Sequence, residues 1–163
     1  MRTTTLACCL VAALTTACGG NTAKSDAEKT AAAISGADSA AAASNPQCKL
    51  FTPAELATYA GQRLSAGEVA AMGSGCQWAA VSGEGSVLIQ VYPAEYHEPH
   101  RGAPGFRQVA DVGTKGFVES ELGGWNAGAI TGPDAVVVAV SGPKASDAVA
   151  IALLKETIAR RRK

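Results

Sequence analysis

Two histidines carry the clearest potential for metal chemistry in this sequence. His97 and His100 are spaced as His-x-x-His, and Glu95 and Glu98 flank them. Imidazole and carboxylate groups are ligands that Zn²⁺ and Cu²⁺ take from proteins. However, Pro99 interrupts helical spacing between the histidines, and a loop holds ligands less firmly than a helix does. We therefore expect a solvated loop here, with a metal site at His97 and His100 as the weaker alternative.

The other chemically capable residues do not form a recognisable catalytic set. Glu119 and Glu121 alternate along an expected strand, so both lie on one face and could serve as an acid and a base. The hydrolase pattern Gly-x-Ser-x-Gly does not occur in the sequence. The glycines of residues 113–124 do not lead into the helix of a nucleotide-binding loop. We expect no enzymatic activity and no cofactor.

The charge balance argues against nucleic acid as a partner. The 163 residues contain 14 Lys and Arg and 14 Asp and Glu, which gives a formal net charge of zero. Affinity for DNA and RNA comes largely from neutralising phosphates with cations. The basic tail 160–163 (RRRK) is expected to complement the C-terminal end of a helix. Contact of this tail with anionic lipid or a cell-wall polymer is the alternative.

The start of the chain is typical of an exported lipoprotein. Arg2 precedes the apolar run 6–14, which is too short to cross the ~30 Å hydrocarbon core of a bilayer as a helix. Small residues and then Cys18 follow, in the order of a lipobox, whose cysteine receives the lipid, including palmitate. We expect residues 1–17 to be a cleaved signal peptide and Cys18 to be the lipidated N-terminus. Ordinary cleavage near Ala17 without a lipid is the alternative.

A tether is expected between the lipid and a folded domain. Residues 19–46 contain ten Ala and four Ser, and their one large aliphatic side chain is Ile34. All eight aromatic residues lie after position 50. A segment without large apolar side chains cannot offset the entropy of ordering it. We therefore expect 18–46 to be a flexible, Ala-rich tether with transient helix, and 47–163 to be one domain.

The cysteines also fit an exported protein. Of the five, Cys8 and Cys9 would leave with the signal, and Cys18 would carry the lipid. Cys48 and Cys76 then remain as an even pair in an oxidising compartment, where a disulfide is the usual outcome. We expect this disulfide, with two free buried thiols as the alternative.

The pattern of residues 47–163 predicts an α+β domain. A capping box at 52–55 (TPAE) begins a helix that Gly61 ends, and a second helix is expected within 144–161, starting around Ser146 and Asp147. Alternating apolar residues between turns predict five strands, over residues 76–81, 86–92, 115–121, 125–131 and 135–141. The last strand is nearly all apolar, so we expect it to be central and buried on both faces. Tight turns predict a single antiparallel sheet of about five strands with helices at both ends of the chain. Residues 93–105 are expected to form a loop, followed by a helical turn over 106–110.

The last helix supplies a candidate interaction surface. At roughly 100° per residue, a stripe within about 60° should face the sheet. This stripe consists of Ile151, Leu154 and Ile158, with Ala148 beside them. Val149 and Leu153 point nearly the opposite way, and Trp125 follows a Gly-Gly turn. These three form a candidate interaction surface if they are exposed. Cover by the first helix or by the 93–105 loop is the alternative.

Two motifs resemble a family of small exported bacterial lipoproteins, the domain of unknown function 3558. Residues 48–55 (CKLFTPAE) resemble the family's opening Cys-x-Leu-Leu-Thr-x-x-Glu, and 75–78 (GCQW) resemble its second Cys-x-Trp. Val112 and Gly113 followed by Phe117 resemble a later stretch of the family. The resemblance implies an envelope lipoprotein with a Cys–Cys bridge and no established activity.

These observations together predict a lipid-anchored protein of the cell envelope with a non-catalytic binding or scaffolding role. Its expected partners are the membrane, through the lipid, and an envelope protein. Its expected location is exported and membrane-anchored, on the outer membrane facing the periplasm if the host is Gram-negative. The alternative is an exported enzyme or metal-binding protein that uses the 93–105 loop.

Overall fold

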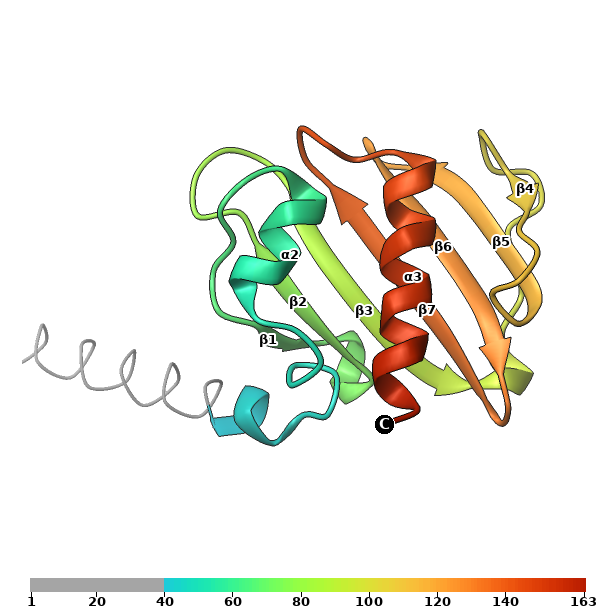
Figure 1. Cartoon of the computed structure of the whole chain (residues 1–163), viewed down its shortest axis with the longest axis horizontal. Helices are drawn as coiled ribbons and strands as arrows, with labels where there is room; N and C mark the ends of the chain where they lie inside the picture. Colours follow the sequence, from blue (N-terminus) through green and yellow to red (C-terminus); the bar gives the residue numbers. More distant parts are fainter. Residues whose placement is uncertain (1–39) are drawn as a thin grey trace, which may run out of the picture. The chain divides into compact units, whose positions relative to one another are not determined.

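The computed structural model describes residues 40–163 (Figure 1). The expected signal peptide 1–17, the lipidated Cys18 and most of the tether lie outside the described residues. Residues 40–44 are helical, and Ala42 and Asn45 are buried, so ordered structure extends upstream of residue 47. Within 40–163, no helix has the length and apolar character required to cross a membrane.

One antiparallel sheet of seven strands forms the centre of the domain. The strands are β1 (Glu68–Ala70), β2 (Gly75–Ala79), β3 (Ser86–Pro93), β4 (Arg107–Gln108), β5 (Thr114–Glu121), β6 (Gly124–Thr131) and β7 (Asp134–Ser141). Their spatial order is β1-β2-β3-β7-β6-β5-β4. The predicted antiparallel sheet is confirmed, and the five long strands lie where the sequence predicts them.

The expected strand count is too low because both edge strands are very short. β1 has three residues and β4 has two, which is too few to carry a visible alternation of apolar and polar residues. β4 also replaces the helical turn expected over 106–110. Its two residues pair with β5, since Arg107 lies opposite Val118 and Gln108 lies opposite Phe117.

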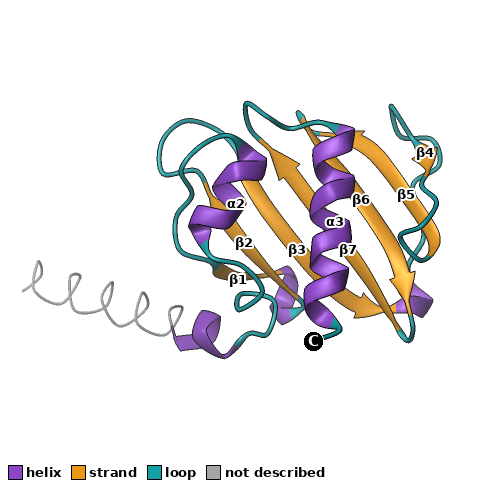
Figure 2. Ribbon diagram, viewed as in Figure 1, coloured by secondary structure: helices purple, strands orange, loops and turns teal. Residues whose placement is uncertain are grey.

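Two helices cover one face of the sheet, α2 (Pro53–Ala60) and α3 (Asp147–Arg161) (Figure 2). The predicted capping box is confirmed: the Glu55 carboxylate accepts the Thr52 N–H at 2.7 Å, and the Glu55 N–H donates to Thr52 Oγ1 at 3.3 Å. Gly61 ends α2 with φ at 77°, a left-handed conformation that favours glycine. The Ser146 hydroxyl caps α3 by accepting the Val149 N–H. Short 3₁₀ helices, η1 (Ala71–Gly73) and η2 (Ala94–Tyr96), follow β1 and β3.

The core lies between these helices and the sheet. It includes Leu56, Trp78, Val87, Ile89, Val118, Ala127, Val138 and Leu154. β7 is the central strand, as predicted, but it is not buried on both faces. Val136, Val138 and Val140 are buried, whereas Val137 and Ala139 are only half-buried because no helix covers the opposite face.

The predicted disulfide is present and joins the start of the domain to the sheet. Cys48 and Cys76 are bonded across a sequence separation of 28, with their Cα atoms 5.1 Å apart. Upstream of the disulfide, the Asn45 side-chain amide donates to the carbonyl oxygen of Gly73 at 3.1 Å. Trp78, two residues from the bridge along β2, is fully buried. The described chain therefore enters the domain at β2.

Leu153 does not meet the condition of exposure set for the candidate interaction surface. This side chain is fully buried, and the buried face of α3 consists of Ala150, Leu153, Leu154, Thr157 and Ile158. The face is wide because α3 packs against β5, β6, β7 and α2 together. Val149 and Trp125 are half-buried and pack against the core, and a Cβ on Gly105 would lie only 3.1 Å from the Trp125 ring. The structure therefore agrees with the alternative prediction, in which other parts of the domain cover these side chains.

Candidate functional site

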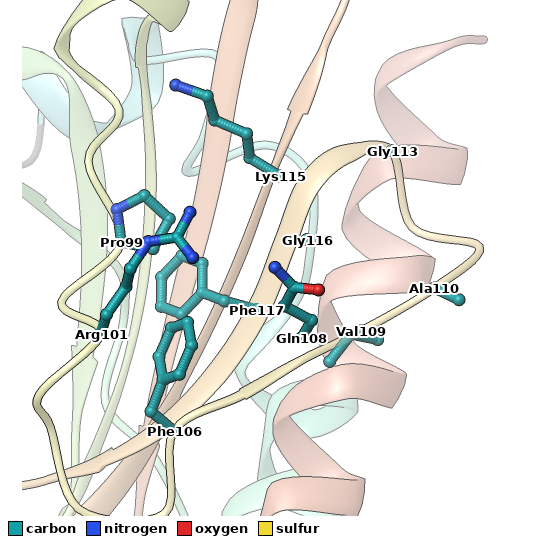
Figure 3. A pocket seen from close by; sticks show the side chains of 10 residues that line it. All are labelled: Pro99, Arg101, Phe106, Gln108, Val109, Ala110, Gly113, Lys115, Gly116 and Phe117. Carbon is teal, nitrogen blue, oxygen red and sulfur yellow. The ribbon is translucent and has the colours of Figure 1, made fainter.

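A groove of about 360 Å³ lies between residues 99–110 and the start of β5 (Figure 3). Its walls include Arg101, Phe106, Gln108, Val109, Lys115 and Phe117. Arg101 and Lys115 are its only ionisable lining residues, and both are exposed. Figure 3 shows the two cations and the two phenyl rings on the side of β5 away from α3.

A β-bulge at the start of β5 positions Lys115. Thr114 pairs with Ile130 and Phe117 pairs with Gly128, so Lys115 and Gly116 together face one residue, Ala129. Bulges of this kind redirect a side chain out of the regular alternation of a strand. Lys115 itself has φ at 52°, in the left-handed region that side chains other than glycine rarely adopt.

Gly116 allows the opposite wall of the groove to approach the strand. Its carbonyl oxygen accepts the Val109 N–H at 2.9 Å. A Cβ at position 116 would lie 2.4 Å from the Val109 oxygen and 2.5 Å from the Val112 side chain, which neither can accommodate. A side chain here would therefore push the 107–110 segment away from β5 and open the groove.

Aromatic rings form the apolar part of the groove. Phe106 and Phe117 are stacked, with ring centroids 6.3 Å apart and an interplanar angle of 16°. Phe117 is buried, while Phe106 is half-buried and reaches the groove from the 99–110 segment. The ring of His97 packs behind Phe117 at a centroid distance of 5.5 Å. The groove thus combines a planar apolar surface with two exposed cations.

The two histidines of the candidate metal site occupy different environments. His97 is 2% exposed, and its Nδ1 lies 3.2 Å from the Tyr92 hydroxyl. Burial lowers the pKa of His97, so the ring is neutral at physiological pH. His100 is exposed. In the part of the chain that the structure describes, no three His, Cys, Asp or Glu side chains lie close enough to hold a metal ion.

Glu119 and Glu121 lie on the same face of β5, as predicted. Glu119 is only 7% exposed, and its Oε2 has no hydrogen-bond partner within residues 40–163. Burial, with the nearby charge of Glu121 as a smaller cause, raises the pKa of Glu119. Glu121 is exposed and accepts a hydrogen bond from the Asn126 amide. Neither carboxylate lines the groove, so the pair contributes no acid or base to it.

The first two arginines of the basic tail bind to the domain itself. The Arg160 guanidinium lies 4.1 Å from the centroid of Phe51 and forms an ion pair with Glu55 at 2.9 Å. Arg161 forms an ion pair with Asp134 at 2.7 Å. The remaining two cations of the tail are exposed. Half of the charge expected to complement the helix end is therefore engaged in contacts with other elements.

Sequence reasoning missed the groove. The segment 112–116 (VGTKG) places a lysine between two glycines, which indicates an irregular start to a strand. The wall of the groove opposite β5 could not be predicted, because its residues 106–110 were expected to form a helical turn and not to pair with β5. Arg101 and Lys115 line the same groove because the 99–110 segment packs along β5, through the β4 pairing and the hydrogen bond from the Val109 N–H to the Gly116 oxygen.

Comparison with models of known protein families finds no family model that matches this chain. Comparison with curated proteins likewise finds no match.

Proposed function

We propose that this protein is a lipid-anchored component of the cell envelope whose domain binds a ligand or partner without catalysing a reaction. The observation that carries the proposal is the disulfide between Cys48 and Cys76. Structural disulfides form and persist in exported proteins and are rare in reducing compartments. Ahead of this bridge, the sequence places a short apolar run and Cys18 in the order of a lipobox.

The groove supports a binding role over a catalytic one. Apart from Lys115, none of its lining residues is one of the usual nucleophiles or acid–base groups, since it has no Ser, Thr, Cys, His, Asp or Glu. What lines it are cations, phenyl rings, an amide and backbone, which are groups that recognise a ligand. The resemblance to the domain of unknown function 3558 supports the same assignment, because the motifs 48–55 and 75–78 include the two bonded cysteines.

The proposed location is the exported face of a membrane, through a lipid on Cys18. If the host is Gram-negative, this is the outer membrane facing the periplasm. The proposal includes the envelope partner that the sequence predicts. The groove is the surface proposed to recognise a ligand.

Substitution of Cys18 tests the anchor. In cells supplied with labelled palmitate, the wild-type protein should be labelled and should sediment with membranes. Cys18→Ser should lose the label and either keep its signal peptide or be released. Cys9→Ser is the matched control, since this cysteine lies inside the expected signal and should change neither result. A Cys18→Ser protein that is still labelled, cleaved and membrane-bound would contradict the proposal.

A further inference from the structure

We propose that the groove between residues 99–110 and the start of β5 binds a small organic anion, a carboxylate or phosphate ester carried on a planar apolar body. This inference deepens the proposed function by naming the class of ligand that the binding domain takes. It rests on three observations: the charge of the lining, its stacked rings and the backbone that holds Lys115 in place.

The lining has positive charge with no acidic residue to balance it. Arg101 and Lys115 form no ion pair within residues 40–163, whereas Arg107, which lies outside the groove, is paired with Asp147 at 2.7 Å. Two exposed cations beside one concave surface attract an anion. A guanidinium can bind both oxygens of a carboxylate or phosphate, and an ammonium adds a point charge beside it.

The volume of the groove and its aromatic lining indicate a ligand with an apolar part in addition to its anionic group. The groove measures about 360 Å³, within the range of roughly 300–1,000 Å³ typical of small-molecule sites. The half-buried Phe106 ring lines the groove, stacked on the buried Phe117, and Val109 adds an aliphatic side chain. An inorganic ion would leave the exposed parts of Phe106 and Val109 in contact with water. A planar ligand body against Phe106 would bury that apolar surface while the charged group of the ligand reaches the cations.

The backbone of β5 retains strain at the lysine that the ligand would contact. Lys115 has φ at 52° inside a bulge, a conformation that glycine and asparagine adopt at a lower energy than lysine does. Gly116 beside it fixes the distance between β5 and the 107–110 segment. Strained positions of this kind cluster at sites where a side chain must be held in one direction. Lys115 lines the groove, and in Figure 3 its side chain lies on the same side of β5 as Arg101.

The groove lies far from the point at which the described chain enters the domain. The described chain enters the domain at β2, where Cys48 is bonded to Cys76. The groove lies at the β4–β5 edge, at the other end of the strand order. Figure 1 shows these two edges on opposite sides of the sheet. A domain anchored through its N-terminal segment would thus present the groove on the side away from the attachment point.

Calorimetric titration of the full chain with simple probes tests the ligand class. Phenyl phosphate and benzoate carry both an anion and a ring, and each should bind saturably to one site. Inorganic phosphate lacks the ring, and benzyl alcohol lacks the charge, so both should bind at least tenfold more weakly. Glycerol 3-phosphate, the polar part of a phospholipid, should bind no more tightly than inorganic phosphate. Headgroup recognition would give the reverse order and would overturn the proposal.

Variants of the two cations test the site itself. Lys115→Asn removes the charge but tolerates positive φ, so the fold should be retained. This variant and Arg101→Gln should each weaken phenyl phosphate binding at least fivefold. Lys115→Arg keeps the positive charge, so it should bind phenyl phosphate as the wild type does. Arg63→Gln is the matched control, because Arg63 is exposed and lies outside the groove.

The proposal would be overturned by several results. These are the absence of binding by both phenyl phosphate and benzoate, equal binding of benzyl alcohol, or unchanged affinity in a folded Lys115→Asn protein. Thermal unfolding of each variant establishes that it is folded. The titrations do not depend on Cys18, so failure of the ligand class and failure of the lipid anchor are distinguished by separate experiments.

Discussion

Glu119 is a buried carboxylate with one oxygen left without a hydrogen-bond partner within residues 40–163. It is 7% exposed, and its Oε2 accepts no hydrogen bond within the described residues. A buried acceptor left unsatisfied costs roughly 1–3 kcal/mol, and more when it is charged. Its raised pKa has the same origin, since burial disfavours the ionised form. At neutral pH this residue therefore opposes folding.

We expect Glu119→Gln to stabilise the domain at pH 7.5 by on the order of 1 kcal/mol. Because the folded-state pKa is raised, protonated Glu119 contributes stability below its unfolded pKa, and that contribution is lost as pH rises through the folded pKa. The gain from Gln should therefore shrink as pH falls toward 4. Urea unfolding at both pH values measures it, with the exposed Glu95→Gln as control. A gain that is equal at both pH values would show that charge is not the cause.

Among the elements, α2 and α3 are joined through Arg160. Its guanidinium donates to Glu55 in α2, to Glu156 one turn earlier and to the carbonyl oxygen of Leu50 at 2.6 Å. It also stacks on Phe51. The hydrogen bond from Arg160 lowers the pKa of Glu55 to about 2. One side chain at the end of the chain thus holds the first helix of the domain.

We expect Arg160→Leu to lower the unfolding midpoint clearly more than Arg162→Leu, because Arg162 is exposed and its side chain forms no ion pair within residues 40–163. The depressed pKa of Glu55 means that its contribution is present above pH 4.5 and is lost as pH falls toward 2. The difference between wild type and Arg160→Leu should narrow over that range. Thermal unfolding monitored by circular dichroism measures this. Equal midpoints for the two variants at pH 7 would contradict the role of Arg160.

For the whole molecule, the disulfide limits how far the unfolded chain can expand. Cys48 lies ahead of α2 and Cys76 lies in β2, so the bridge closes a loop over a sequence separation of 28. Loops of this size correspond to roughly 2–4 kcal/mol of stability in the chain-entropy model. The bridge also fixes the segment that carries α2 against the edge of the sheet.

We expect the double variant Cys48→Ala, Cys76→Ala to be destabilised by roughly 2–4 kcal/mol at equilibrium. Reduction of the wild-type protein should lower the guanidinium midpoint similarly. The same reductant should leave the double variant unchanged, which controls for effects elsewhere in the chain. If reduction left the wild-type midpoint unchanged, the disulfide would not be a source of stability.

Local signals made much of the architecture predictable. The capping box at 52–55, the glycine that ends α2 and the Ser146 cap act within a few residues, so the sequence alone indicates them. The same holds for the five long strands, whose alternation and turns are continuous in sequence. The pairing of Cys48 with Cys76 followed from counting the cysteines that lie outside the expected signal peptide and the expected lipidation site.

The groove and the buried face of α3 depended on contacts that no local pattern contains. Leu153 lies outside the stripe assigned to the sheet-facing side of the helix, but α3 contacts three strands and α2, so its buried face is wider and includes Leu153. Lys115 and Arg101 line the same groove because two residues of β4 pair with β5. Such a short pairing is stabilised by the surrounding fold and not by its own sequence.

Residue patterns were sufficient to predict the class of domain, the ends of its helices, its long strands and the cysteine pair, because each depends on neighbouring residues or on a simple count. The strand order, with β7 between β3 and β6, and the site at the β4–β5 edge depend on the folded structure. Strand order depends on which apolar faces bury one another across the whole chain. The environments of Glu119, His97 and Lys115 depend in turn on which parts of the chain that strand order packs against them.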